Sequence, residues 1–284
     1  MIVVTGASGQ LGRLVIQNLL QTLPAERIVA AVRSPEKVAD LAALGVQVRK
    51  ADYDQPATLK SAFAGASRVL LISSNAVGVR VAQHKAVIAA AENAGVELLA
   101  YTSLLRADSS PLALASEHVL TEAVIRASGL RYAMLRNGWY TEIYAMGIPM
   151  ALKHGALIGC AGEGRIASAA RADYASAAAA VLVGDASGNQ VCELAGDDSY
   201  TLAELAAETS RQSGKLVSYV NMTEAGLKTA LIKAGVPANH AEVRANSDSG
   251  AAIGGLFDDS HQLSTLIGRA TTPMKQTVAD VLAG

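Results

Sequence analysis

The stretch that decides the fold lies at the start of the chain and reads Ile2-Val3-Val4-Thr5-Gly6-Ala7-Ser8-Gly9-Gln10-Leu11-Gly12. Its apolar beginning predicts a strand, and apolar residues at four-residue steps from Leu11 onward predict a helix. A strand, a glycine turn and a helix in this order are the setting of a dinucleotide-binding loop. Gly6 permits a tight turn, Gly9 lets the backbone approach a pyrophosphate, and Gly12 lets the helix pack closely on the strand.

The start of the predicted helix also offers free N–H groups and a positive dipole end to phosphates. The glycine spacing is G-x-x-G-x-x-G rather than the generic G-x-G-x-x-G, so an ordinary strand-to-helix turn stays the alternative. Its position between a strand and a helix favours a cofactor loop. We expect a dinucleotide to contact the residues of this turn, namely Gly6, Ala7, Ser8, Gly9, Gln10 and Leu11.

Composition excludes several classes of protein. The chain has 284 residues, of which 51% are hydrophobic and 17% charged, and its net charge is −1, so no basic field attracts nucleic acid or an anionic membrane. No run of about 18 apolar residues lacks charges, which predicts no membrane span. The first strand begins at residue 2 without a leader, and the two cysteines have no motif spacing, so we expect a cytoplasmic protein with inert thiols.

Strands and helices alternate through the first half of the chain, which predicts an α/β fold, a Rossmann-type doubly wound parallel sheet. After the first strand, we predict strands over 28–32, 46–49, 68–72, 96–101 and 130–135. Polar residues follow each strand, and the carboxyl ends of parallel strands share one edge, where ligands bind. These polar tails are Gly6–Gly12, Arg33, Asp52, Ser73–Asn75, Thr102–Ser103 and Asn137–Tyr140.

The alternation loosens after residue 140. We therefore predict an NADP-binding domain over 1–140, followed by a small, mostly helical C-terminal cap and substrate region over 141–284. Within the latter, 155–195 is expected to return to the sheet. Strands are predicted over 191–194 and 216–220, and three or four short helices from residue 223 onward.

The end of the second strand chooses between the two nicotinamide cofactors. An acidic residue there would hold a ribose 2′-OH, whereas an arginine would pair with a 2′-phosphate. Arg33 and Ser34 stand at this place, Lys37 follows one turn later, and there is no carboxylate at the strand end itself. This pattern favours NADP(H), although a solvated arginine would look the same. Asp52 and Tyr53 would fall near the adenine, and the alternative for Asp52 is to cap the next helix.

The chain resembles the NmrA-like group of atypical short-chain dehydrogenases/reductases. Within that group it is most similar to the bacterial NADPH-dependent quinone reductases, with triphenylmethane dye reductases as near relatives. The resemblance rests on residues 5–12, 70–74, 100–104, 135–140, 166–174 and 254–260. It implies NADPH in the cleft and a quinone, or another flat aromatic compound, as hydride acceptor.

One motif of short-chain dehydrogenases is absent, because none of the eight tyrosines has a lysine four residues later. In Tyr-x-x-x-Lys the lysine lowers the pKa of the tyrosine so that it protonates an alkoxide. Hydride addition to a quinone instead gives a phenolate-type oxyanion, whose conjugate acid has a pKa near that of tyrosine, about 10. Water or a hydrogen-bond donor suffices there, so the absence favours quinones or dyes over ordinary ketones.

For the reaction site we predict Asn137 and Tyr140 as catalytic residues, with Asn137 donating to the nicotinamide amide or to a quinone oxygen. Tyr144 lies one helical turn after Tyr140, so the two could flank a flat ring, and Phe257 could close the pocket. The alternative for both tyrosines is a packing role. Further cofactor contacts are expected from the strand ends: Ser73, Ser74, Asn75, Thr102, Ser103, Asn137, Gly138, Trp139 and Tyr140.

No metal site is predicted, because the His118 and Glu122 pair offers only two ligands and zinc takes three or four. Three functions remain open. They are an NADPH-dependent quinone oxidoreductase, a reductase of triphenylmethane dyes or other conjugated acceptors, and a regulator that senses NADP(H) without turnover. The oligomeric state stays open.

Overall fold

The structure is a computed structural model that describes residues 1–185 and 187–284. The chain forms two compact units. The first comprises Met1–Ala107, Ser116–Asn137 and Arg171–Cys192, and the second comprises Asp108–Ala115, Gly138–Ala170 and Glu193–Gly284. Of the range 155–195 that was predicted to return to the sheet, the part that does so begins at Arg171.

The first unit is built on a seven-stranded sheet with the strand order β3-β2-β1-β4-β5-β6-β8. All neighbouring pairs from β3 to β6 are parallel. The strand order reverses direction between β1 and β4, which is the position where doubly wound sheets bind dinucleotides. The strands are β1 (Ile2–Thr5), β2 (Ile28–Val32), β3 (Gln47–Lys50), β4 (Arg68–Leu71), β5 (Leu98–Leu104), β6 (Tyr132–Asn137) and β8 (Gln190–Leu194).

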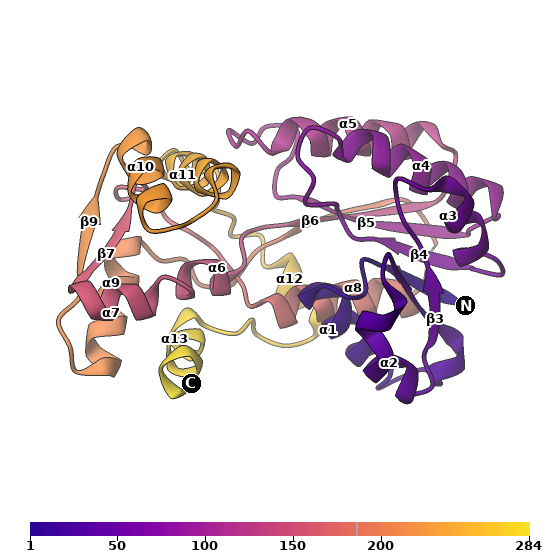
Figure 1. Ribbon diagram of the computed structural model, residues 1–284, viewed down its shortest axis with the longest axis horizontal. Helices are drawn as coiled ribbons and strands as arrows, with labels where there is room; N and C mark the ends of the chain where they lie inside the picture. Colours follow the sequence, from indigo (N-terminus) through magenta and orange to yellow (C-terminus); the bar gives the residue numbers. More distant parts are fainter. Residues whose placement is uncertain (186) are drawn as a thin grey trace. The chain divides into compact units, whose positions relative to one another are not determined.

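Helices cover both faces of this sheet (Figure 1): α3, α4 and α5 lie on one face, and α1 and α8 on the other. This arrangement confirms the predicted Rossmann-type α/β fold. The helical segments of this part are α1 (Gln10–Leu19), η1 (Ala25–Arg27), η2 (Pro35–Val38), α2 (Ala39–Ala43), α3 (Pro56–Ala62), α4 (Arg80–Asn93), α5 (Ala115–Ala127) and α8 (Arg171–Val183).

The core on the α3–α5 face follows from the strand register. Val3 pairs with Val29 on one side and with Val69 on the other, so the three side chains project to the same face. There they pack with Phe63 and Ile88 of the covering helical layer, and all five are buried. Residues on both faces of these strands are buried, as a parallel sheet between two helical layers requires.

Both ends of β5 differ from the predicted strand over 96–101, by two residues at the start and three at the end. Val96 was assigned to the fifth strand, but its N–H bonds to the carbonyl of Ala91 and closes the end of α4, where Gly95 has a φ of +66°. At the other end β5 continues through Leu104, because Thr102, Ser103 and Leu104 pair with β6. The pairing with β6, and not local apolarity, therefore sets the end of β5.

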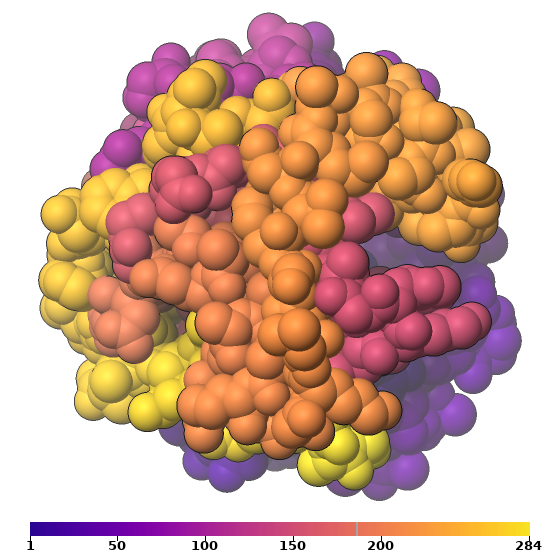
Figure 2. Space-filling view, turned by 90° about the vertical axis from the view of Figure 1, so that its left-hand side faces the viewer, coloured from indigo at the N-terminus to yellow at the C-terminus, as the bar shows by residue number. Residues whose placement is uncertain are grey.

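The second unit is mostly helical and holds a two-stranded parallel sheet of β7 and β9. The sequence analysis did not predict β7, a four-residue strand whose partner lies about sixty residues further along the chain. In the space-filling view of Figure 2 the orange stretch around β9 and α10 runs down the middle of the face. The elements are α6 (Thr141–Ala145), α7 (Ile148–His154), β7 (Ala156–Gly159), α9 (Leu202–Ser213), β9 (Ser218–Asn221), α10 (Glu224–Lys233), α11 (Ala238–Ala252), α12 (Gln262–Ile267) and α13 (Met274–Ala283).

None of the described helices combines the length and the apolar character needed to cross a bilayer.

Candidate cofactor site

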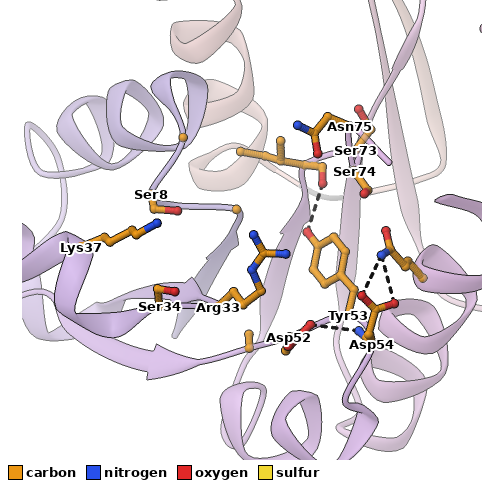
Figure 3. Close-up of a pocket in the computed structure, with 15 residues that line it drawn as sticks. Ser8, Arg33, Ser34, Lys37, Asp52, Tyr53, Asp54, Ser73, Ser74 and Asn75 are labelled. Carbon is orange, nitrogen blue, oxygen red and sulfur yellow. Dashed lines mark hydrogen bonds between the residues drawn. The ribbon is translucent and has the colours of Figure 1, made fainter. Parts of the chain in front are cut away.

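A cavity of about 350 Å³ opens at the carboxyl ends of β1, β2, β3 and β4 in the first unit. Its size is within the range of small-molecule sites. Figure 3 shows side chains from four strand ends converging on it. The lining residues are Gly6, Ser8, Gly9, Arg33, Ser34, Lys37, Ala51, Asp52, Tyr53, Asp54, Ile72, Ser73, Ser74, Asn75 and Gln83.

The glycine turn forms the end of the cavity next to α1. Gly6 has a φ of +60°, a conformation that other residues rarely adopt, and its carbonyl accepts the Gly9 N–H at 2.9 Å. A Cβ on Gly12 would lie 2.7 Å from both the Cα of Ala7 and the carbonyl oxygen of Gly6, so no side chain fits there. Gly9 begins α1 without a side-chain cap, which leaves the first N–H groups of the helix available for a phosphate.

Two cations line the cavity beside β2. Arg33 and Lys37 are exposed, and within residues 1–185 and 187–284 neither the guanidinium nor the ammonium has a hydrogen-bond or ion-pair partner. Figure 3 shows the Arg33 guanidinium pointing into the cavity between the glycine turn and the ring of Tyr53. Two unpaired cations beside the hydroxyl of Ser34 suit an anionic group with several acceptor oxygens, such as a phosphate.

The turn that carries Lys37 is held from α1. Arg13 donates to the Lys37 carbonyl oxygen at 2.6 Å and also pairs with Asp40, which fixes η2 and α2 against the start of α1. This contact leaves the Lys37 ammonium on the cavity side. The sequence analysis noted Lys37 but gave Arg13 no role, because their contact spans 24 residues and no local pattern indicates it.

The opposite wall consists of the residues that follow β3. Asp52 accepts the Asp54 N–H at 3.1 Å and the Gln55 side-chain amide at 3.0 Å, so it orders this turn and does not cap α3, whose N-cap is Gln55. Tyr53 reaches across the sheet, with its hydroxyl 2.6 Å from Thr5 Oγ1 and 3.1 Å from the Ile72 carbonyl oxygen. Burial raises the pKa of Tyr53, which stays protonated and gives the cavity a flat, neutral surface.

The loop after β4 contributes Ser73, Ser74 and Asn75 to the cavity, as the strand-end rule predicts. Thr102 and Ser103, the predicted contacts from the end of β5, are buried and have other partners. The Thr102 hydroxyl accepts the Ser73 N–H at 2.8 Å, and the Ser103 hydroxyl donates to Glu122 at 2.6 Å. Thr102 thus holds the start of the loop that follows β4, and Ser103 connects the end of β5 to α5. The contact of either residue with a cofactor stays a prediction.

Asn137, the last residue of β6, has a buried side-chain oxygen that no described residue satisfies. The residue is 6% exposed, and its buried Oδ1 accepts no hydrogen bond from the part of the chain that the structure describes. A buried acceptor without a partner is costly, so a ligand donor is expected to satisfy it. The chain then continues into the second unit, where Gly138 donates to the Leu194 carbonyl, Trp139 is buried, and half-buried Tyr140 lies in a bridge with Ala169.

Tyr144 and Phe257 both belong to the second unit. Tyr144 is 1% exposed, the Arg244 guanidinium lies 4.3 Å from its ring centroid, and the ring packs edge-on against Tyr200. Burial, with the nearby Asp248 carboxylate, raises the pKa of Tyr144 well above its usual value. This geometry gives Tyr144 a packing role in its own unit. Phe257 is half-buried, and a substrate contact for either residue stays a prediction.

Comparisons with known proteins agree with this geometry. Residues 6–185 match a family model described as NAD(P)H-binding. The chain belongs to the NAD(P)H-binding family. Its cofactor is NAD(P)H, which confirms the dinucleotide predicted from the glycine turn.

Several similar proteins are reductases. Quinone oxidoreductase 2 of Escherichia coli is 54% identical over 98% of both chains. The crystal structure of the NADPH-dependent quinone oxidoreductase of that organism, complexed with NADPH, has a TM-score of 0.96 at 53% identity, covering 99% of this chain and 100% of the other. Triphenylmethane reductase of Citrobacter sp., complexed with NADP(H), has a TM-score of 0.96 at 40% identity, with coverage of 99% and 100%. The resemblance stated from the sequence motifs is confirmed.

Sequence reasoning missed four lining residues of the cavity: Ala51, Asp54, Ile72 and Gln83. Gln83 comes from the first turn of α4 and donates to both carboxylate oxygens of Asp54, at 3.0 and 3.1 Å. This pair joins two segments that lie 29 residues apart, and neither residue belongs to a motif. Across the described residues, no group of three or more His, Cys, Asp or Glu side chains is placed to hold a metal ion.

Proposed function

We propose that this protein is an NADPH-dependent quinone oxidoreductase. The observation that carries the cofactor half of the proposal is a pair of cations in the dinucleotide cavity, Arg33 and Lys37, whose side chains have no hydrogen-bond or ion-pair partner within residues 1–185 and 187–284. The whole-length similarity to a quinone oxidoreductase supports the acceptor half. The nicotinamide cofactor supplies a hydride, which carries two electrons and one proton, and the reduced acceptor takes its second proton from water or a nearby donor.

The residues of the cavity bind the adenosine half of the cofactor. The backbone of the glycine turn and the start of α1 receive the pyrophosphate. Arg33, Lys37 and Ser34 hold the 2′-phosphate, since a guanidinium and an ammonium with no carboxylate partner have their full charge available. A ribose 2′-OH would leave both cations unpaired, and NADH therefore binds more weakly.

Asn137 holds the reactive end. Its orphan Oδ1 accepts a hydrogen bond from the carboxamide N–H of the nicotinamide, and this bond fixes the rotation of the ring. The sequence predicts that Asn137 donates a hydrogen bond, whereas the unsatisfied atom in the structure is its acceptor, Oδ1. Tyr140 lies three residues later in the chain, and we propose that it contacts the acceptor molecule.

The chain supplies little acid catalysis, in keeping with a quinone as substrate. No tyrosine has a lysine four residues later, and burial raises the pKa values of Tyr53, Tyr101, Tyr144 and Tyr200. A hydroquinone product needs no strong proton donor, because its oxyanion is only weakly basic, with a conjugate acid of pKa about 10. The protein accelerates the reaction by holding two flat rings in contact and in the right orientation.

The test follows the absorbance of reduced nicotinamide with benzoquinone, naphthoquinone and a triphenylmethane dye as acceptors. Rapid NADPH oxidation with either quinone supports the proposal. Oxidation with the dye alone assigns the chain to the dye reductases, a second candidate that the 40% identity to triphenylmethane reductase favours. Tight NADPH binding without turnover on any acceptor assigns it to the sensors.

We further propose that the protein works in the cytoplasm, because both Cys160 and Cys192 are thiols and reduced thiols persist there. Cell fractionation followed by detection of the protein tests this location, and recovery in an oxidising compartment contradicts it.

A further inference from the structure

A network of buried polar side chains lies beneath the loop that follows β4. Its members are Arg80 and His84 of α4, Tyr101 of β5, and His118 and Thr121 of α5. All five are at least nine-tenths buried, and none of them lines the cofactor cavity. Polar groups without a ligand role are unusual in such a place, where apolar packing would serve stability equally well.

The network holds the backbone of Ser74 at both of its polar groups. The Ser74 N–H donates to Nε2 of His84 at 3.0 Å, and the Ser74 carbonyl accepts the Nε–H of Arg80 at 2.5 Å. Side chains six and ten residues later therefore fix a single residue of the cavity wall. We call Arg80, His84, His118 and Thr121 together the Ser74 clamp.

The hydrogen bonds determine which nitrogen of each histidine carries the proton. His84 Nε2 accepts from Ser74, so Nδ1 carries the hydrogen and donates to Thr121 Oγ1 at 3.0 Å; Thr121 in turn donates to the Glu117 carbonyl at 2.9 Å. A guanidinium has only donors, so His118 Nε2 accepts from Arg80 at 3.2 Å and its Nδ1–H points to the Tyr101 hydroxyl at 2.8 Å. Both imidazole rings are therefore neutral, and each of their four nitrogens takes part in one of these hydrogen bonds.

The rest of the loop is fixed in the same manner. The Ser73 N–H bonds to Thr102, the Ala76 N–H bonds to the Ser74 hydroxyl at 3.1 Å, and the Gly78 N–H bonds to Glu117 at 3.0 Å. The loop thus takes its shape from side chains of β5, α4 and α5 rather than from backbone ladders. Because β4 borders the point where the strand order reverses, this loop lies where a dinucleotide crosses the sheet edge.

We propose that Arg80 and His84 are positioning residues for NADPH, which act by fixing the Ser74 backbone so that Ser73, Ser74 and Asn75 face the cofactor. The clamp orders the loop before the cofactor arrives, and binding then does not require the loop to lose conformational freedom. This inference rests on the cofactor site and not on the identity of the acceptor.

The experiment measures NADPH binding at equilibrium by titration, without an acceptor, together with hydrogen exchange of the 73–78 amides in the absence of cofactor. His84→Ala removes the acceptor for the Ser74 N–H. We expect its NADPH dissociation constant to rise about 5- to 10-fold, the effect of one lost hydrogen bond and a loosened loop, and the Ser74 amide to exchange faster. His84→Gln places an amide oxygen near the position of Nε2 and restores most of the affinity.

The matched control is Val87→Ala, one turn further along the same helix, at a fully buried position in the apolar core of the α3–α5 face. It lowers the melting temperature through a cavity but leaves the dissociation constant and the exchange of the loop amides unchanged. Equal dissociation constants for wild type and His84→Ala overturn the proposal, as does an equal weakening by His84→Ala and Val87→Ala.

If His84→Ala does not fold, Arg80→Lys takes its place, since it keeps the charge but loses the Nε–H that reaches the Ser74 carbonyl. A dissociation constant raised about 3-fold or more supports the clamp, and an unchanged one overturns it. Failure of the chain to reduce quinones would refute the proposed function and leave this binding result intact.

Discussion

Two groups of cationic side chains in the first unit differ in what surrounds them. Arg33 and Lys37 beside β2 are exposed, line the cavity and have no partner among the described residues. Arg80 and Arg136 are 5% exposed and donate to protein groups, Arg80 to Ser74 and His118, Arg136 to Glu122. Exposed cations in a cavity are available for a ligand, whereas buried cations are committed to the protein. Substitutions should therefore separate binding from stability.

The largest expected effect is on stability, at Glu122. This carboxylate is 1% exposed and accepts hydrogen bonds from Arg136, Arg126 and Ser103. Burial alone would raise the pKa of Glu122, but the hydrogen bonds from Arg136 and Ser103 outweigh it and hold the pKa below its usual value. Glu122→Ala removes the carboxylate to which the buried Arg136 guanidinium donates, and we expect the free energy of unfolding to fall by about 3–5 kcal/mol in urea denaturation.

The control for Glu122 is Glu242→Ala, which breaks an exposed ion pair with Lys228 and should cost less than about 1 kcal/mol. If the two variants lose the same stability, the distinction between buried and exposed cations does not hold.

The second effect is on cofactor choice. Arg33→Asp puts a negative charge against the 2′-phosphate. We expect the ratio of kcat/KM for NADPH to that for NADH to fall about 100-fold, and the free energy of unfolding to stay the same. Steady-state kinetics with both cofactors measures it. Arg27→Asp, at an exposed arginine of η1 that does not line the cavity, is the control. An unchanged preference in Arg33→Asp would show that the 2′-phosphate lies elsewhere.

The third effect is on the pH dependence of stability. Burial, followed by the charge of Arg80, lowers the pKa values of His84 and His118 from 6.5 to about 3. The unfolded chain therefore binds more protons than the folded one below pH 6.5. Their contribution to stability is complete above pH 6.5 and decreases as the pH falls towards 3, by about 1.4 kcal/mol per pH unit for each histidine. The other titratable groups that face the two rings are Glu117, Glu122, Tyr53 and Tyr101.

Urea denaturation between pH 7 and pH 5 measures this slope in the wild type and in His84→Gln, which has no ring to protonate. A slope that is the same in the two proteins would mean that His84 does not titrate in this way.

The smallest effect is expected at Lys37. Lys37→Met keeps the length of the side chain but removes its charge, so KM for NADPH should rise about 5-fold at low salt, and KM for NADH should stay the same. Because salt screens an exposed charge, the difference from wild type should shrink as ionic strength increases. A rise in KM for both cofactors would mean that Lys37 supports the turn and does not contact the 2′-phosphate.

The first half of the fold was predictable because its signals are local. The glycine turn, the β-branched strands and the glycines that end helices lie within a few residues of the structures they indicate. The strand β7 was missed because its only pairing is with distant β9. Tyr140 and Tyr144 were predicted to face the same way, but Tyr144 packs against Arg244 and Tyr200, which no spacing within α6 indicates.

The residues of the candidate site were likewise predictable only in part. The strand-end rule correctly placed Arg33, Asp52 and Ser73–Asn75 at one cavity. It also proposed Thr102 and Ser103, whose hydroxyls instead bond to the Ser73 N–H and to Glu122. A polar residue at a strand end has the same appearance in a sequence whether it faces a ligand or a buried neighbour, so this part required coordinates.

The sequence by itself determined the Rossmann-type sheet, the dinucleotide loop and the basic residue at the end of β2, because each depends on backbone geometry or on spacing within one strand–turn–helix unit. Only the tertiary structure decided that, among the described residues, the side chains of Arg33 and Lys37 have no partner and Asn137 Oδ1 accepts no hydrogen bond. The tertiary structure also decided that Arg80 and His84 bond to the Ser74 backbone. The hydrogen bonds and the burial of each group depend on which side chains, distant in the sequence, the fold places beside it. The type of the residue alone does not determine them.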